Sequence, residues 1–188
     1  MANSDAPRGF TPTHQRPDKY RRYYKGTTAG IIGVGDPVVR ATDSSDPEGR
    51  AEIVRATTGS AITGIVVGIE PTRGDLAKLH LASADTGYVL VDDDPRSLFT
   101  VQDNGGGTGI VVANIGEHVD CVAAIDANTS TGRSNYELDT EALATGNTFR
   151  VERLVQREDN VVGANAEWIV SVNLHTDANA SATRKTEI

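Results

Sequence analysis

Residues 87–105 read GYVLVDDDPRSLFTVQDNG. The residues from Tyr88 to Val91 alternate between faces as a half-buried strand requires, and Leu98–Gln102 repeats this pattern. Three aspartates and Pro95 interrupt the alternation between these two segments. Because Pro95 lacks an amide hydrogen and restricts Asp94 to extended geometry, it cannot lie inside a strand ladder. The stretch therefore predicts two short strands joined by an acidic corner at the edge or end of a sheet.

The rest of the chain predicts an all-β fold. Its 188 residues contain 5% aromatic residues, and the apolar content consists mainly of Val, Ile, Leu and Ala. Short β-type segments separated by Gly, Asp, Ser and Pro favour a compact β-barrel or β-sandwich, because many short strands need their edges covered. We predict strands over 29–34, 37–41, 51–56, 62–70, 76–81, 88–91, 98–102, 110–114, 119–125, 148–156 and 168–174. One short helix is predicted over 137–143, with Ser134 as its cap.

The N-terminal segment differs in composition from the rest of the chain. Residues 1–28 contain six basic and two acidic residues, a balance of +4. Because the whole chain has a net charge of −8, residues 29–188 carry a charge of −12. Three prolines spaced five apart favour an extended backbone. We therefore predict an extended arm over 1–28, a β domain over 29–176 and a flexible tail over 177–188. The basic and aromatic candidates for partner contacts in the arm are Arg8, Phe10, Arg16, Lys19, Tyr20, Arg21, Arg22, Tyr23 and Tyr24.

Two kinds of partner fit such an arm. Arginine and tyrosine side chains could neutralise phosphates and stack on unpaired bases, which leaves single-stranded nucleic-acid binding as an alternative. The strongly acidic body would repel a nucleic-acid backbone, so we favour an acidic surface on a partner protein or on a neighbouring copy. A disordered, solvated terminus is the remaining interpretation.

No pattern typical of an active site or metal site stands out. Asp92, Asp93 and Asp94 carry oxygen ligands but lack EF-hand spacing, so a solvated turn is preferred over a metal site. His14, His80, His118 and His175 show no paired spacing typical of zinc sites, and Cys121 lies in an apolar segment that indicates a buried thiol. We therefore expect no enzymatic activity, no cofactor and no metal. The sequence also lacks a secretory h-region and a membrane-length apolar run, which indicates a soluble protein made in a cytoplasm.

Several segments together resemble the capsid decoration, or cement, proteins of tailed bacteriophages. They are Tyr20-Arg21, Gly35-Asp36-Pro37-Val38, 64–68, Val89–Gln102 with its Asp-Asp-Pro, 131–134, 137–139, 159–160, 162–166 and 173–175. They follow one another in the same order as in that family, from about Tyr20 to His175. The resemblance implies a viral structural protein without enzymatic activity. It would bind the major capsid protein on the outer surface of the virion, after synthesis in the host cytoplasm, and stabilise contacts between capsomers.

Symmetry and charge add two expectations. A homo-oligomer is expected, with a trimer preferred at three-fold positions and a dimer as the alternative. The acidic corner and Arg96 form a candidate electrostatic contact loop, Asp92, Asp93, Asp94 and Arg96. We predict that these aspartates meet Arg21 or Arg22 of an adjoining copy.

Overall fold

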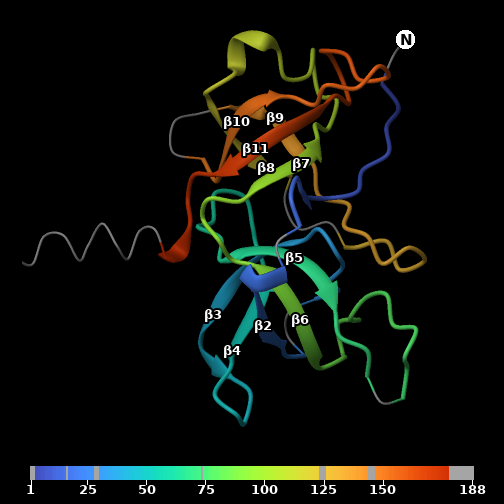
Figure 1. Cartoon of the computed structure of the whole chain (residues 1–188), viewed down its shortest axis with the longest axis vertical. Coiled ribbons are helices and arrows are strands. Elements are labelled where there is room, and N and C mark those ends of the chain that lie inside the picture. Colours follow the sequence, from blue (N-terminus) through green and yellow to red (C-terminus); the bar gives the residue numbers. More distant parts are fainter. Residues whose placement is uncertain are drawn as a thin grey trace, which may run out of the picture.

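The structure, a computed structural model, describes residues 3–15, 17–27, 30–72, 74–122, 126–143 and 147–177. Its strands form two β structures, which confirms the all-β prediction (Figure 1). The closed barrel has the order β2-β4-β3-β5-β6 and consists of β2 (Tyr20–Lys25), β3 (Pro37–Ser45), β4 (Ala51–Arg55), β5 (Gly64–Ile69) and β6 (Gly87–Asp92). The sheet has the order β1-β7-β11-β10-β8-β9 and consists of β1 (Thr11–Pro12), β7 (Leu98–Gln102), β8 (His118–Cys121), β9 (Leu138–Leu143), β10 (Phe149–Leu154) and β11 (Glu167–Val172).

The barrel closes through β2. This strand pairs antiparallel with β6 over its whole length, from Tyr20 opposite Asp92 to Lys25 opposite Gly87, and parallel with β4 through Tyr24 and Glu52. Of the segment predicted to be an extended arm, Thr11–Pro12 and Tyr20–Lys25 are extended, whereas Pro17–Lys19 form a 3-10 helix. The prediction that this segment lies outside the β domain is wrong, because the backbone of β2 is hydrogen-bonded to β4 and β6 as a strand of the barrel.

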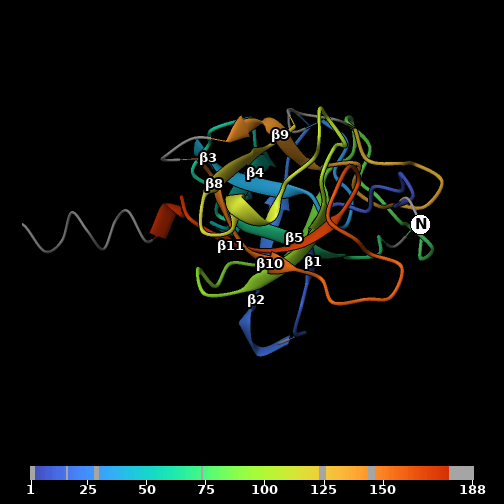
Figure 2. The ribbon, with the colours of Figure 1, turned by 90° about the horizontal axis from the view of Figure 1, so that it is seen from above.

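The sheet lies on one end of the barrel, as the two perpendicular views show (Figures 1 and 2). Neighbouring residues of β3 and β5 point into different cores. Val38 and Val66 belong to the barrel core, whereas Val39 and Ile65 contact the sheet core. At these positions the two strands are therefore apolar on both faces, because they form the layer that both cores share.

The corner at 93–97 connects the barrel to the sheet. Its two strands are those predicted, since β6 and β7 flank it. Along β6, Val89 and Val91 are buried while Tyr88 and Leu90 are only half-buried, which is the alternation seen in the sequence. The chain makes a second passage between the two structures from β1 to β2, through a short 3-10 helix at Pro17–Lys19.

The predicted helix over 137–143 is wrong. Residues Leu138–Leu143 form β9, which pairs antiparallel with β8. Tyr136 and Leu138 are both fully buried, two residues apart, so the spacing of the core residues is that of a strand. Ser134 accepts the Tyr136 amide in a local turn instead of starting a helix.

Three of the predicted strands are absent from the described chain. Within 30–34, Ile32 and Val34 form isolated bridges, and of 76–81 only Leu81 does so. Instead of a strand over 110–114, a 3-10 helix occupies Val112–Asn114. None of the helices among the described residues is long and apolar enough to span a bilayer.

Candidate functional site

The two passages of the chain between sheet and barrel lie side by side and are joined by ion pairs. Lys19, at the end of the 3-10 helix, donates to the Asp94 carboxylate at the corner. Two residues further on, Arg21 Nε lies 3.3 Å from Asp93 Oδ2. Within one chain both aspartates therefore already have cationic partners, and the predicted contact with Arg21 or Arg22 of an adjoining copy stays a prediction.

The corner itself is ordered by its aspartates. Asp92 Oδ1 accepts the Ser97 hydroxyl at 2.9 Å, and Asp94 Oδ1 accepts the Arg96 amide at 3.0 Å. Burial raises the pKa of Asp92, whereas the hydrogen bond from Lys19 holds the pKa of Asp94 below its usual range. The carboxylates therefore cap backbone amides and meet cations as predicted, but the turn is not fully solvated, because Asp92 and Asp93 are buried at 1% and 6% exposure. Among the described residues, no three His, Cys, Asp or Glu side chains converge as a metal ion would require.

A polar chain, buried at Tyr23 and Asp93 and half-buried at Arg40 and Asp177, continues from the corner to the end of the described residues. The Tyr23 hydroxyl donates to Asp93 Oδ2 at 2.9 Å and accepts from Arg40 at 3.0 Å. Arg40 in turn pairs with Asp177 at 3.3 Å. Burial raises the pKa of Tyr23. Residues 178–188 of the predicted tail lie outside the described residues, but Asp177 is held by this network.

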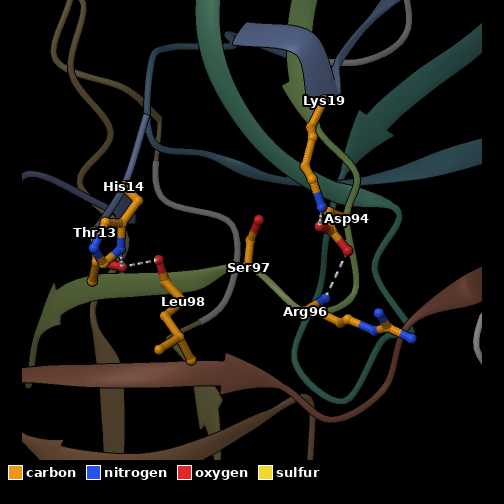
Figure 3. A pocket seen from close by; sticks show the side chains of 7 residues that line it. All are labelled: Thr13, His14, Lys19, Asp94, Arg96, Ser97 and Leu98. Atoms are coloured by element: carbon orange, nitrogen blue, oxygen red, sulfur yellow. Dashed lines mark hydrogen bonds and ion pairs between the residues drawn. The ribbon is translucent and has the colours of Figure 1, made fainter. Parts of the chain in front are cut away.

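Two hollows share Lys19 and Asp94 in their walls. One has a volume of about 320 Å³ and is also lined by His14, Arg96 and Ser97, as Figure 3 shows. The other has a volume of about 300 Å³ and is also lined by Arg21 and Asp93, among others. The ion pair is thus partly accessible from solvent.

The predicted partner contacts divide into buried and exposed residues. Phe10 and Tyr23 are buried, at 1% and 5% exposure, so the prediction that they contact a partner is wrong. Phe10 stacks on Phe149 in the sheet core with ring centroids 4.3 Å apart. Arg8, Arg21 and Arg22 are exposed. Lys19, Tyr20 and Tyr24 are half-buried, and Arg16 lies outside the described residues.

The side chains that could bind nucleic acid are largely engaged within the chain. Arg22 forms a bidentate pair with Glu70, with both distances 2.7 Å, and its guanidinium lies 3.6 Å from the centre of the Tyr88 ring. Tyr24 also contacts Tyr88, at 5.8 Å between ring centroids. Binding of single-stranded nucleic acid stays a prediction, and these contacts within the chain do not favour it.

Three buried ionisable residues hold backbone segments in place through hydrogen bonds, a role that the sequence did not predict. Asp36 accepts the Gly33 amide at 2.9 Å, and burial raises the pKa of Asp36 to about 6. Lys25 and Asp103 are fully buried and each bonds several backbone groups. The position of Asp36 between Gly35 and Pro37 is typical of a tight turn and could have indicated its structural role. Lys25 lies in a basic, aromatic segment, and nothing in that pattern distinguishes it from the exposed basic residues.

Lys19 and Asp94 permit a direct test of pairing within one chain. In a double-mutant cycle with Lys19→Ala and Asp94→Ala, we expect a coupling of about 0.5–1 kcal/mol in the free energy of unfolding, because the pair is partly exposed. Urea unfolding of dilute, unassembled protein measures it. If the coupling were absent in the dilute protein and present only in assembled particles, the pairing would have to be between copies.

These contacts define an all-β protein in which a closed five-stranded barrel is joined to a six-stranded sheet at two adjacent chain passages. No protein-family model matches the chain, and no curated protein or solved structure is significantly similar to it.

Proposed function

We propose that this protein is a bacteriophage capsid decoration protein, which binds the outer surface of the head and stabilises contacts between capsomers of the major capsid protein. One observation carries the proposal. Six of the segments that resemble that family, although far apart in the sequence, are joined to one another by backbone or side-chain contacts: 20–21, 35–38, 64–68, 89–102, 131–134 and 162–166.

Four contacts illustrate these connections, each joining two of the resembling segments. They are the Gly35 amide to the Val66 carbonyl at 2.8 Å, the pairing of Ile65 with Asp92, the Gln102 side-chain amide to the Asn165 carbonyl at 2.8 Å, and the side-chain hydrogen bond between Asp36 and Ser134. The resemblance therefore concerns the part of the fold that sets how the barrel and the sheet are placed.

The physical requirements of a cement protein agree with this architecture. A protein that ties neighbouring capsomers must transmit load without opening, and a closed barrel leaves no free strand edge that could start to unpair. Binding at several points of a rigid body adds avidity. The exposed Arg21 and Arg22, both on β2, are the proposed contacts with an acidic capsid surface, whose carboxylates would compete with Asp93 and Glu70 for the two guanidinium groups. A trimer at three-fold positions belongs to the same proposal.

Binding to heads assembled without the protein tests the proposal. Wild-type protein is expected to bind such heads saturably, and Arg21→Ala/Arg22→Ala is expected to bind at least about tenfold more weakly, because interface arginines often contribute a kilocalorie or more each. Co-sedimentation with purified heads of the same phage measures both affinities. Deleting the first 25 residues would be a poor test, since it removes the strand that closes the barrel.

The control is Arg150→Ala/Arg153→Ala, which removes the same charge from β10 of the sheet, where both arginines are exposed. This variant is expected to bind as wild type does. Failure of folded wild-type protein to bind heads would refute the proposed function, whereas equal binding by all three proteins would refute only the role of Arg21 and Arg22.

A further inference from the structure

A hollow of about 580 Å³ lies between the N-terminal segment and the loop that precedes β9. Residues 34–35 hold both of its walls in place. The Phe10 amide donates to the Gly35 carbonyl at 3.0 Å on one side, and the Ser134 amide donates to the Val34 carbonyl at 2.9 Å on the other. Two segments more than a hundred residues apart in sequence are thereby fixed opposite each other. The volume falls within the range of ligand-binding sites in proteins.

The loop wall is shaped by its own hydrogen bonds. Asn128 Oδ1 accepts the amides of Ser130 and Thr131 at 3.0 and 3.2 Å, and the Gly132 amide donates to the Asn128 carbonyl at 2.7 Å. Gly132 has a φ of 69°, and a β-carbon there would lie 2.2 Å from the Leu79 carbonyl oxygen. The loop therefore has a defined shape before any ligand arrives, which lowers the entropic cost of binding.

The charge of this hollow is opposite to that of the molecule. The chain carries a net charge of −8, yet Arg8 and Arg133 both line the hollow and no carboxylate does so among the described residues. Neither guanidinium has an ion-pair partner in the described part of the chain. Seven other arginines do form such pairs: Arg21, Arg22, Arg40, Arg50, Arg55, Arg150 and Arg157. Two unpaired guanidinium groups at one preformed hollow indicate a site for anionic groups.

The remaining wall atoms favour a peptide over other anions. A guanidinium fork matches a carboxylate through two parallel hydrogen bonds. Asn135 Nδ2 already donates to the Asp126 carbonyl at 2.8 Å, so its Oδ1 is left for a ligand, as is Nδ2 of Asn128. One amide donor and one amide acceptor suit the N–H and C=O groups of a backbone. No aromatic side chain among the described residues lines the hollow as a platform for a sugar ring.

We propose that this hollow binds an acidic peptide segment of a partner protein, with two of its carboxylates held by Arg8 and Arg133. The hydroxyls of Thr11 and Thr131, which also line the hollow, can bond the same segment. An acidic segment would bind here whether or not the partner is a capsid protein, so binding is measured without capsids.

The probe is a hexapeptide of glutamate with blocked ends, titrated into the full-length protein at low salt and followed by calorimetry. Wild-type protein is expected to bind it, and Arg8→Ala/Arg133→Ala is expected to bind at least tenfold more weakly. The matched control Arg96→Ala/Arg153→Ala removes two other exposed arginines that have no ion pair among the described residues, and it is expected to keep wild-type affinity.

Three results would overturn the proposal: no binding of hexaglutamate by wild type, equal loss of affinity in the control, or inorganic phosphate competing as strongly as the peptide. The last would indicate a general anion site. A second measurement uses the wild type alone, so it does not depend on how the variants fold. Hexaglutamate is expected to shift the side-chain amide resonances of Asn128 and Asn135, and hexaglutamine to leave them in place; unshifted resonances with hexaglutamate would also count against the site.

Discussion

Replacing Asp103 by Asn is expected to lower the free energy of unfolding by about 3–5 kcal/mol, because the buried carboxylate accepts four hydrogen bonds. Its Oδ1 accepts the amides of Gly105 and Asn165 at 3.0 and 2.8 Å. Its Oδ2 accepts the indole N–H of Trp168 at 3.1 Å and the Ile110 amide at 3.4 Å. An asparagine would present one oxygen to these donors and turn its own NH₂ group toward the others. Urea unfolding followed by the fluorescence of Trp168, the single tryptophan, measures the change.

The matched control for Asp103 is Asp159→Asn. The Asp159 side chain is 68% exposed and pairs with Arg157 at the surface, so this substitution is expected to leave the stability close to that of wild type. If Asp103→Asn were as stable as this control, the carboxylate would not be the centre that holds β7, the 160–166 loop and β11 together.

The second large effect is expected at Lys25. Lys25→Met should lower the free energy of unfolding by about 3 kcal/mol, because a buried ammonium group is replaced by an apolar one among carbonyls that then lose their donor. Lys25 Nζ donates to the carbonyl oxygens of Gly26, Ala82, Ser83 and Asp85 at 3.0, 2.8, 3.2 and 2.8 Å. Burial lowers the pKa of Lys25. Thermal unfolding followed by circular dichroism measures the loss.

Lys78→Met provides the comparison for Lys25. Lys78 lies near the same turn and pairs with Asp85 at 2.8 Å, but it bonds no backbone carbonyl among the described residues. A loss of at most about 1 kcal/mol is expected there. Equal losses in both variants would show that the turn needs positive charge in general and not the bonds that Lys25 makes.

Prediction from the sequence succeeded where local pattern and burial agree. Between 87 and 105, the alternation in β6, the break at Pro95 and the start of β7 are all found in the structure. Leu98–Gln102 was predicted with its observed bounds. In such segments each residue's environment follows from the period-2 geometry of a strand, so no distant partner needs to be known.

Prediction failed where distant partners decide the structure. Residues 137–143 suit a short helix locally, but pairing with β8 makes them a strand. The sequence of 20–25 is typical of a basic, aromatic arm. In the structure this segment forms β2, which pairs with both β4 and β6 and so closes the barrel. The acidic corner meets N-terminal cations, but these are Lys19 and Arg21 of the same chain, and the predicted contact with an adjoining copy stays a prediction.

The sequence by itself determined the all-β class, the acidic corner between two strands and the polarity of charge between the N-terminal segment and the rest. These features depend on residue type and short spacing, which are local properties. Only the tertiary structure decided that the barrel closes through Tyr20–Lys25, that Phe10 and Tyr23 are buried, and that Arg8 and Arg133 face one hollow. Those outcomes depend on contacts between residues as far as 139 positions apart, such as Phe10 and Phe149, and such contacts arise from competition among all segments for the same buried surface.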